Sequence, residues 1–500
     1  MMKTGILKSV TLCLIICGFS AIIKAQEKKA SSSTGIGTVT SWDVTDPFYP
    51  KYHLAAPFGW MNDPHPVYFK GAYHLFYQFS YVRDNPYGRT GLLPGQRPMR
   101  NWGHIMSTDL VHWRHMPVVM KPETHGRAND PHIFSGCVVD NNGTGTAIYT
   151  IDNKQIYIAN SKDNDLATFT KYPDNPVVND VPTGLETVGQ MRDPWVWKEG
   201  NSWYMIIGSG LAGGKGAVIP LYKSSDLIHW DYQHPFYRAD SSKFNFPGDA
   251  GFCECPSFFR LGNKYVLILS DKATYLVGRY ENYRFVPEYR NRLDYGKIYV
   301  PQFMMDGKGR KLMLGWIRDG RNNQSWVKAG WAGSQTLPRV LTMSPDGSLN
   351  YEPAEELKAL RSDQKSFSDI RISGSEFKIL DNIKGMQFEI SATFEPGKAK
   401  NFGMEFLDGE STAKLVYDVA TKTLQFNDIS APLDLKGGNL NLRVFIDGET
   451  IEVYANKKVC ITNAIQPSTP EGFRIKLFSA DGQAVVRKID IWKMGTIWGN

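Results

Sequence analysis

The chain has 500 residues, which is long for a single hydrophobic core, so we expect two domains. Aromatic residues make up 13% of the chain, which suits an all-β protein and supplies flat faces on which sugar rings can stack. The formal charge is +7, but the positive residues are scattered and form no block suited to a phosphate backbone, which argues against nucleic-acid binding.

The N-terminus has the pattern of an export signal. A short basic start precedes an apolar run from Ser9 to Ile23, and the Ala25–Gln26 bond is a suitable cleavage point. The run is too short for a membrane span. We therefore predict a signal peptide over residues 1–25, a flexible leader over 26–44, and an exported protein, periplasmic or secreted, with no integral membrane span.

The cysteines raise one alternative for localisation, a lipid anchor, and they argue against a disulfide framework and a zinc site. Cys17 lies in the apolar run and raises the alternative of a lipid anchor at the cell surface, which the bulky Ile16 before it disfavours. Beyond the predicted signal, Cys253 and Cys255 are too close to bridge easily, and no histidines follow at zinc-ligand spacing. With only Cys137 and Cys460 besides, the pattern indicates neither a disulfide framework nor a zinc site.

Five copies of one pattern follow along the chain. Each copy has an acidic or apolar residue near a proline, followed by an apolar strand, a Gly or Asn turn and a second strand. The spacing between copies suits one four-stranded blade each, so residues 45–345 are predicted to form a five-bladed β-propeller. The copies begin at Asp63-Pro64, Asp130-Pro131, Asp193-Pro194, Glu254-Cys255-Pro256 and Val300-Pro301.

The propeller prediction brings three acidic residues together. The first strand of each blade lines the central axis, so Asp63, Asp193 and Glu254 are expected to meet in one cavity. Neighbouring carboxylates repel, and at least one pKa should therefore rise, which is how one site holds an acid beside a base. The alternative is that acid-proline pairs merely cap turns, and this is the interpretation we favour for Asp130.

The pattern changes near Pro338. A short charged segment is predicted to form a linker over residues 346–361. Polar and apolar residues then alternate with period two, with Asp-Gly turns between the runs, which predicts a β-sandwich over 362–500. Its acidic residues are scattered on strand faces, so no chemistry is expected there.

The motifs, taken in order, resemble glycoside hydrolase family 32, which includes invertases, inulinases and levanases. The resemblance runs from about residue 50 to the C-terminus, and it rests on six or more motifs in the right order. These motifs are Trp60-Met-Asn-Asp-Pro64, Phe76-Tyr-Gln78, Trp102-Gly-His104, Phe134-Ser-Gly136, Arg192-Asp-Pro194, Glu254-Cys255, Gly315-Trp316, Gly330-Trp-Ala-Gly333, Leu337-Pro-Arg339 and the phrase FIDGETIEVYAN.

The resemblance implies a retaining hydrolase that releases fructose from β-fructofuranosides such as sucrose, inulin or levan. Asp63 resembles the nucleophile, Glu254 the general acid/base and Asp193 the residue that stabilises the transition state. Such chemistry needs a nucleophile and an acid/base close together, and it needs no metal or cofactor. The expected partner is the carbohydrate substrate, and the sequence does not indicate an oligomeric state. Implied sugar-binding positions are Trp60, Asn62, Gln78, Phe134, Ser135, Arg192 and Trp316.

The sequence departs from the family pattern twice. His65-Pro66 replaces the usual Asn-Gly after the first motif, and the proline removes a backbone donor near Asp63. An insertion over residues 83–100 intervenes where the family carries a tryptophan, and Tyr87 is the candidate to replace that tryptophan. We expect arginines of this insertion to face the cavity and to favour release of single fructose units, against the plainer interpretation of a solvated surface loop.

Two alternatives remain at this point. A fructan-binding protein without catalysis would be expected to lack a carboxylate, whereas all three are present. A fructosyltransferase, or a hydrolase for another furanoside, would use the same carboxylates, and it would differ only in acceptor or substrate.

Overall fold

A computed structural model describes residues 44–80, 100–122, 132–239, 252–321, 323–374, 377–380, 382–409 and 411–498. The predicted signal peptide with Cys17, almost all of the predicted leader, Tyr87 and Asp130 lie outside the described residues. Within the described part of the chain, no helix is long and apolar enough to cross a membrane.

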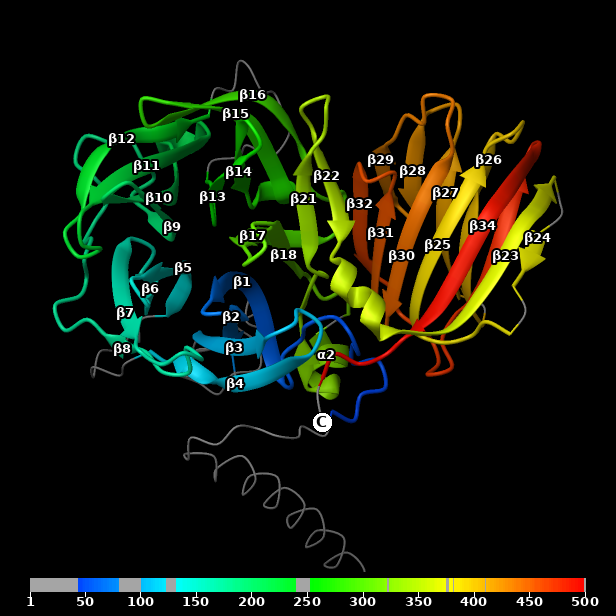
Figure 1. The fold of residues 1–500 in the computed structure, drawn as a ribbon, viewed down its shortest axis with the longest axis horizontal. Helices are drawn as coiled ribbons and strands as arrows, with labels where there is room; N and C mark the ends of the chain where they lie inside the picture. Colours follow the sequence, from blue (N-terminus) through cyan, green and yellow to red (C-terminus); the bar gives the residue numbers. More distant parts are fainter. Residues whose placement is uncertain are drawn as a thin grey trace, which may run out of the picture. The chain divides into compact units, whose positions relative to one another are not determined.

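Five antiparallel sheets form a five-bladed β-propeller, as predicted, and their first strands surround the axis (Figure 1). The first blade contains β1 (Gly59–Phe69), β2 (Ala72–Ser80), β3 (Asn101–Ser107) and β4 (Trp113–Met120). The second contains β5 (Ile133–Asn141), β6 (Thr144–Ile151), β7 (Gln155–Ser161) and β8 (Thr170–Lys171). The third contains β9 (Met191–Glu199), β10 (Ser202–Gly210), β11 (Ala217–Ser224) and β12 (Asp231–Arg238). The fourth contains β13 (Ser257–Leu261), β14 (Lys264–Leu269), β15 (Thr274–Glu281) and β16 (Arg284–Arg292).

The fifth blade contains β17 (Ile298–Met305), β18 (Lys311–Ile317), β21 (Arg339–Met343) and β22 (Leu349–Pro353), with β20 (Ser334–Gln335) paired to β18. Strand β22 lies inside the segment predicted as a linker, so the start of that linker at residue 346 is wrong. Only a 3₁₀ helix, Glu355–Leu360, separates β22 from the sandwich. The charged residues of this segment suggested a linker, but the segment contains a strand whose Leu349 and Tyr351 side chains are buried.

The ring of blades is closed by a late segment of the chain. After β18, the chain forms the helix α2 (Asn323–Ala329) and then the short strand β19 (Trp331–Ala332), which pairs in parallel with β1 of the first blade. The backbone N–H of Gly59 also donates to the carbonyl of Gly330, at 2.8 Å. Hydrogen bonds between residues about 270 positions apart thus tie the last blade to the first, which covers the inner edge of the first blade.

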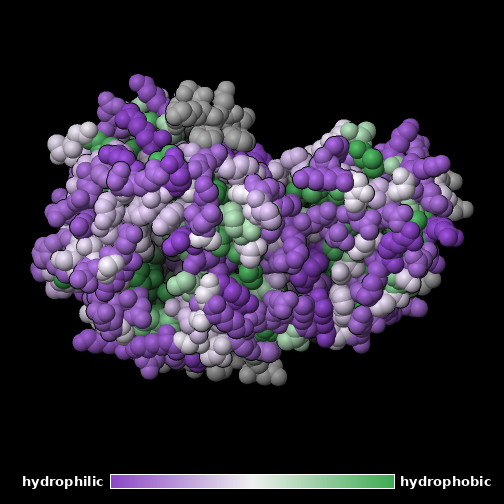
Figure 2. Space-filling view, turned by 45° about the horizontal axis from the view of Figure 1, so that its top comes forward, coloured by the Kyte–Doolittle hydropathy of each residue, from purple (hydrophilic) through white to green (hydrophobic). Residues whose placement is uncertain are grey.

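Apolar composition explains why the blades pack. Every residue of β2 is buried, because this strand lies within a blade and contacts neighbours on both faces. The sequence Ser-x-Asp-Leu-x-His-Trp occurs twice, at Ser107–Trp113 and at Ser224–Trp230, and it forms the same turn in two blades. In each turn the aspartate, Asp109 or Asp226, accepts hydrogen bonds from the backbone N–H groups two and three residues later. Figure 2 shows a largely hydrophilic surface, in which apolar residues are mostly recessed.

Two six-stranded sheets form the C-terminal β-sandwich, with its own apolar core. One sheet contains β23 (Arg361–Ser373), β34 (Gln483–Met494), β25 (Gln387–Glu395), β30 (Leu440–Asp447), β31 (Thr450–Ala455) and β32 (Val459–Ala464). The other contains β24 (Phe377–Ile379), β33 (Arg474–Ala480), β26 (Asn401–Asp408), β27 (Ser411–Asp418), β28 (Thr423–Phe426) and β29 (Ile429–Pro432).

A buried charge network joins the propeller to the sandwich. Arg339, which is fully buried, donates to Asp294 at 2.9 Å and to Glu452 of β31 at 2.7 Å. His53 lies between Asp447, at 3.0 Å, and Glu452, at 3.1 Å. Burial opposes a charge on His53, but its hydrogen bonds to the two carboxylates outweigh this and raise its pKa from 6.5 to about 9. Each buried charge therefore has an opposite charge in contact.

Candidate active site

Irregularities in the inner strands turn side chains toward the axis. The pairing register shifts between Met61 and Pro64 in β1, between Ile133 and Gly136 in β5, and between Tyr299 and Gln302 in β17. Such bulges re-aim side chains, and they recur at barrel rims and active sites.

Three residues of the repeated elements adopt the left-handed backbone region, and one of them is Val300, with a φ of 47°. Asp193 has a φ of 64° and Cys255, next to Glu254, has a φ of 45°. This conformation is uncommon for residues other than glycine and is found in excess at functional sites. The repeated proline-containing element of the sequence therefore coincides with a backbone bend that directs side chains toward the axis.

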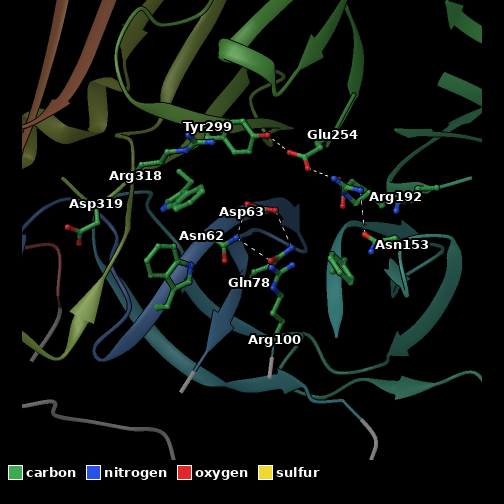
Figure 3. A pocket seen from close by; sticks show the side chains of 15 residues that line it. Asn62, Asp63, Gln78, Arg100, Asn153, Arg192, Glu254, Tyr299, Arg318 and Asp319 are labelled. Carbon is green, nitrogen blue, oxygen red and sulfur yellow. Dashed lines mark hydrogen bonds and ion pairs between the residues drawn. The ribbon is translucent and has the colours of Figure 1, made fainter. Parts of the chain in front are cut away.

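The three carboxylates predicted to converge line one cavity of about 720 Å³ (Figure 3). They come from three blades: Asp63 from the first, Asp193 from the third and Glu254 from the segment that leads into the fourth. The full lining is Trp60, Asn62, Asp63, Gln78, Arg100, Phe134, Asn153, Gln190, Arg192, Asp193, Glu254, Tyr299, Trp316, Arg318 and Asp319.

Asp63 is held by three side chains. Its Oδ2 accepts hydrogen bonds from Ser135 Oγ at 2.6 Å and from Gln78 Nε2 at 3.1 Å, and its Oδ1 accepts from Asn62 Nδ2 at 3.0 Å. Burial raises the pKa of Asp63, as does the nearby Glu254, while the Ser135 hydrogen bond and the Arg100 charge oppose the rise. These contacts fix both oxygens of a carboxylate whose remaining exposure is toward the cavity.

Asp193 has a strongly raised pKa. Burial raises its pKa to about 7, the charges of Glu254 and Asp63 add to the rise, and Arg192 opposes it. Its Oδ2 accepts a hydrogen bond from the backbone N–H of Cys255 at 3.1 Å. A rise of at least one carboxyl pKa was expected from mutual repulsion. The rise is found in Asp63 and Asp193, but burial contributes more to it than repulsion does.

Glu254 is held by two donors from neighbouring blades. Arg192 donates from Nη2 to Oε1, and the Tyr299 hydroxyl donates to Oε2. Arg192 also packs its guanidinium over the Phe252 ring, 4.1 Å from its centroid. Burial, followed by the Glu254 charge, raises the pKa of the Tyr299 hydroxyl, so this group stays a hydrogen-bond donor at neutral pH.

Aromatic rings form the walls beside the carboxylates. Trp60 meets Trp316 edge to face with ring centroids 5.6 Å apart, and Tyr299 meets Trp316 at 6.2 Å. On the opposite wall, the Arg100 guanidinium lies 4.9 Å from the Phe134 ring centroid. A cavity with apolar walls, and with acids and amides between them, suits a ligand such as a sugar, whose ring has apolar faces and hydroxyls at its edge.

Of the predicted binding residues, Trp60, Asn62, Gln78, Phe134, Arg192 and Trp316 line the cavity, and Ser135 lies behind Asp63. Tyr87 lies outside the described residues. His65, which departs from the family pattern, does not line the cavity. Its ring is buried against Trp102 with centroids 4.5 Å apart, and burial lowers its pKa to about 3, so it is neutral.

Sequence reasoning missed several lining residues: Asn153, Gln190, Tyr299, Arg318 and Asp319. Tyr299 precedes the Val300-Pro301 repeat directly, so the repeat itself held a signal that points to it. Asn153 belongs to the turn between β6 and β7 and carries no such signal. Arg100 was expected at the cavity only as one of the arginines of the insertion.

None of the cysteines that the structure describes forms a disulfide bond. Cys137, Cys253, Cys255 and Cys460 are free and buried, in agreement with the prediction that they form no disulfide framework. In the ranges that the structure describes, no group of three or more His, Cys, Asp or Glu is placed to hold a metal ion.

Comparison with known proteins decides the family. The model for the glycosyl hydrolases family 32 N-terminal domain matches residues 53–353, and the model for the family 32 C-terminal domain matches residues 356–493. The chain belongs to glycosyl hydrolase family 32. This family 32 chain is therefore a glycoside hydrolase, and the resemblance found in its motifs is confirmed.

Relatives of this family 32 enzyme share most of its length. It is 29% identical to the sucrose-6-phosphate hydrolase of Escherichia coli, over 90% of this chain and 95% of that protein. It is 30% identical to the levanase of Bacillus subtilis, over 90% of this chain and 71% of that protein.

Solved structures share the fold. Fructan 1-exohydrolase IIa from Cichorium intybus superposes with a TM-score of 0.77 at 22% identity, over 90% of this chain and 98% of that one. Exo-inulinase from Aspergillus awamori superposes with a TM-score of 0.74 at 22% identity, over 92% of this chain and 100% of that one.

Proposed function

We propose that this family 32 enzyme is a retaining β-fructofuranosidase that releases single fructose units from sucrose and from inulin- or levan-type fructans. The observation that carries the proposal is the convergence of Asp63, Asp193 and Glu254 in one cavity with aromatic walls. Relatives named as a sucrose-6-phosphate hydrolase, a raffinose invertase and a levanase support a fructoside as the substrate.

In the first step, Asp63 attacks the anomeric carbon of the bound fructosyl unit. Hydrogen bonds from Ser135, Gln78 and Asn62 hold its two oxygens in place, so that little reorganisation precedes the attack. Glu254, in its protonated form, gives its proton to the leaving oxygen. Arg192 and Tyr299 each donate a hydrogen bond to one of the two Glu254 oxygens and so orient this carboxyl group.

In the second step, water attacks the fructosyl–Asp63 ester. Glu254 is now ionised and accepts a proton from that water, while Arg192 and Tyr299 donate hydrogen bonds to its carboxylate. Each step inverts the anomeric centre, so the product retains the β configuration. Ionised Asp193 stabilises the positive charge that develops on the ring in both transition states.

Product analysis tests this function. Purified protein is incubated with sucrose, inulin and levan, and the proposal predicts that free fructose appears from at least one of them. Methanol added as a competing acceptor is expected to give methyl β-fructofuranoside, because two displacements retain configuration. The α anomer would contradict a retaining mechanism, and no fructose from any of the three substrates would contradict the function.

A further inference from the structure

The sandwich contacts one wall of the catalytic cavity. The chain that follows β18 of the fifth blade contributes Arg318 and Asp319 to the lining of the cavity. The next residue, Gly320, lies so close to the sandwich that a Cβ atom on it would come within 2.4 Å of the Ala464 Cβ atom. Gln466 Nε2 also donates to the Gly320 carbonyl at 3.2 Å. Sandwich residues therefore contact the same short segment whose side chains form the wall.

Arg321 joins this wall to the sandwich through ion pairs. Its Nη2 donates to Asp319 Oδ2 at 2.6 Å and its Nε donates to Asp319 Oδ1 at 3.0 Å, so both oxygens of Asp319 are held. The same Nε lies 2.9 Å from Oε2 of Glu449, in the turn between β30 and β31 of the sandwich. The Arg321 side chain is only 5% exposed. A guanidinium this buried depends on its oxygen partners, because an uncompensated buried charge is costly.

Glu449 is one of three carboxyl groups around this guanidinium. Burial raises its pKa to about 8, the charge of Arg321 opposes the rise, and the charges of Asp319 and Asp46 add to it. A proton on Glu449 relieves the repulsion among the three acids near pH 7. What Glu449 offers Arg321 at that pH is therefore an oxygen acceptor, which an amide at the same position could also supply.

Arg318 lies on the leaving-group side of the cavity. Its guanidinium is 4.1 Å from the ring centroid of Tyr299, whose hydroxyl donates to Glu254. In the proposed mechanism Glu254 gives its proton to the leaving oxygen, so a group beside Tyr299 faces the unit that departs. In Figure 3, Arg318 extends to Tyr299 from the side of the cavity on which Asp319 lies. Arg318 is exposed, and its five N–H donors suit contact with hydroxyls of a leaving sugar.

We propose that Glu449 of the sandwich is a positioning residue for recognition of the leaving group. It holds Arg321, which fixes Asp319 and so sets the position of the neighbouring Arg318. The sandwich thereby influences which leaving group the enzyme accepts, although none of its described residues lines the cavity. This inference rests on the proposed function.

The test compares two fructosides that differ in the leaving group. One is whichever of sucrose, inulin and levan the parent cleaves fastest, and its leaving group carries hydroxyls. The other is β-fructofuranosyl fluoride, whose leaving group carries none. Glu449→Ala should lower kcat/KM on the first by about tenfold, the effect of one lost hydrogen bond to a charged group, and should change it on the fluoride by less than about twofold.

A double-mutant cycle with Arg318→Ala tests the route from Glu449 to the substrate. Arg318→Ala should show the same dependence on the leaving group, and Glu449→Ala should have little further effect in the Arg318→Ala background. Glu449→Gln, which keeps an oxygen for Arg321, should retain most of the activity at pH 7. Glu395→Ala, which removes the exposed partner of Arg487 from the same domain, is the control and should match the parent.

Thermal unfolding shows which variants fold, and Glu449→Asp, which withdraws the carboxyl group by one methylene, is the milder variant to use if Glu449→Ala does not fold. Equal losses on both substrates in a folded Glu449 variant would mean that Glu449 supports only the fold. Additive losses in the cycle would mean that it does not act through Arg318. Either result, or an unchanged kcat/KM on the hydroxyl-bearing substrate, overturns the inference and leaves the proposed function intact. A parent enzyme that releases fructose from none of these substrates contradicts the proposed function itself.

Discussion

Arg192 lies between two of the three carboxylates: its Nη2 donates a hydrogen bond to Oε1 of Glu254, and its Nε lies 3.7 Å from Oδ2 of Asp193. One guanidinium thus contacts carboxylates from two adjacent blades. It orients Glu254, and it opposes the rise in pKa that burial imposes on Asp193. The acids of this cavity are coupled through it, so a change at Arg192 should alter the pH dependence as well as the rate.

Replacement of Arg192 by Gln should shift the acid limb of the pH profile of kcat/KM upward. In the parent, Asp193 must be ionised, so activity is present above its pKa of about 7 and is lost as pH falls through that value. Loss of the guanidinium removes the charge that lowers this pKa, and the limb moves to higher pH. Arg192→Lys keeps the charge and should move the limb less. An unchanged acid limb in folded Arg192→Gln would show that Arg192 does not tune Asp193.

Replacement of Glu254 by Ala should separate the two chemical steps. Sucrose hydrolysis is expected to fall by orders of magnitude, because its leaving oxygen needs a proton, while a substrate with a good leaving group should lose far less. Added azide should attack the fructosyl–enzyme ester and give a β-fructosyl azide, detected by mass spectrometry and NMR. If azide neither restores turnover nor appears in a product, Glu254 is not the acid/base.

Replacement of His53 by Gln should destabilise the protein in a pH-dependent way. The folded pKa of about 9 exceeds the ordinary 6.5, so the stabilisation is fully present below about pH 6.5 and is lost as pH rises through 9. The free-energy difference from the parent should be on the order of 3 kcal/mol near pH 6 and should shrink by pH 9.

Chemical unfolding at both pH values measures this difference. His112→Gln, which removes an exposed His–Asp pair, is the control and should change little. A His53→Gln effect that is equal at both pH values would mean that packing, and not charge, accounts for the role of His53.

The fold was predictable from the sequence because propeller blades repeat. An acidic or apolar residue near a proline recurs in five copies, and this element places Asp63 and Asp193 at equivalent bends, so their convergence followed from the repeat. Closure of the ring by β19 was not predicted, since Trp331 and Ala332 make too short a strand to leave a pattern. Strand β22 was assigned to a linker for a different reason, because charged residues dominate the segment that contains it.

The site was predictable as far as its motifs extend. Tyr299 directly precedes the Val300-Pro301 copy of the repeat, which is a local signal for it. Arg318 depends on how the fifth blade packs beside the fourth, which no local pattern encodes. The same holds for Arg339, whose partner Glu452 lies 113 residues away. Repulsion between acids predicted the direction of the pKa shifts, but burial, which is their larger cause, becomes visible only once the chain is folded.

The central claim is that Asp63 forms a covalent bond with fructose. The most direct measurement uses Glu254→Ala, in which breakdown of the ester is slowed, mixed with β-fructofuranosyl fluoride, quenched, digested and analysed by mass spectrometry. If Asp63 is the nucleophile, the peptide that contains Asp63 should carry one added fructosyl residue. No such adduct should form in Asp63→Asn, whose turnover of sucrose should fall by orders of magnitude with its fold intact. An adduct on a different residue, or activity of Asp63→Asn within about tenfold of the parent, would contradict this role of Asp63.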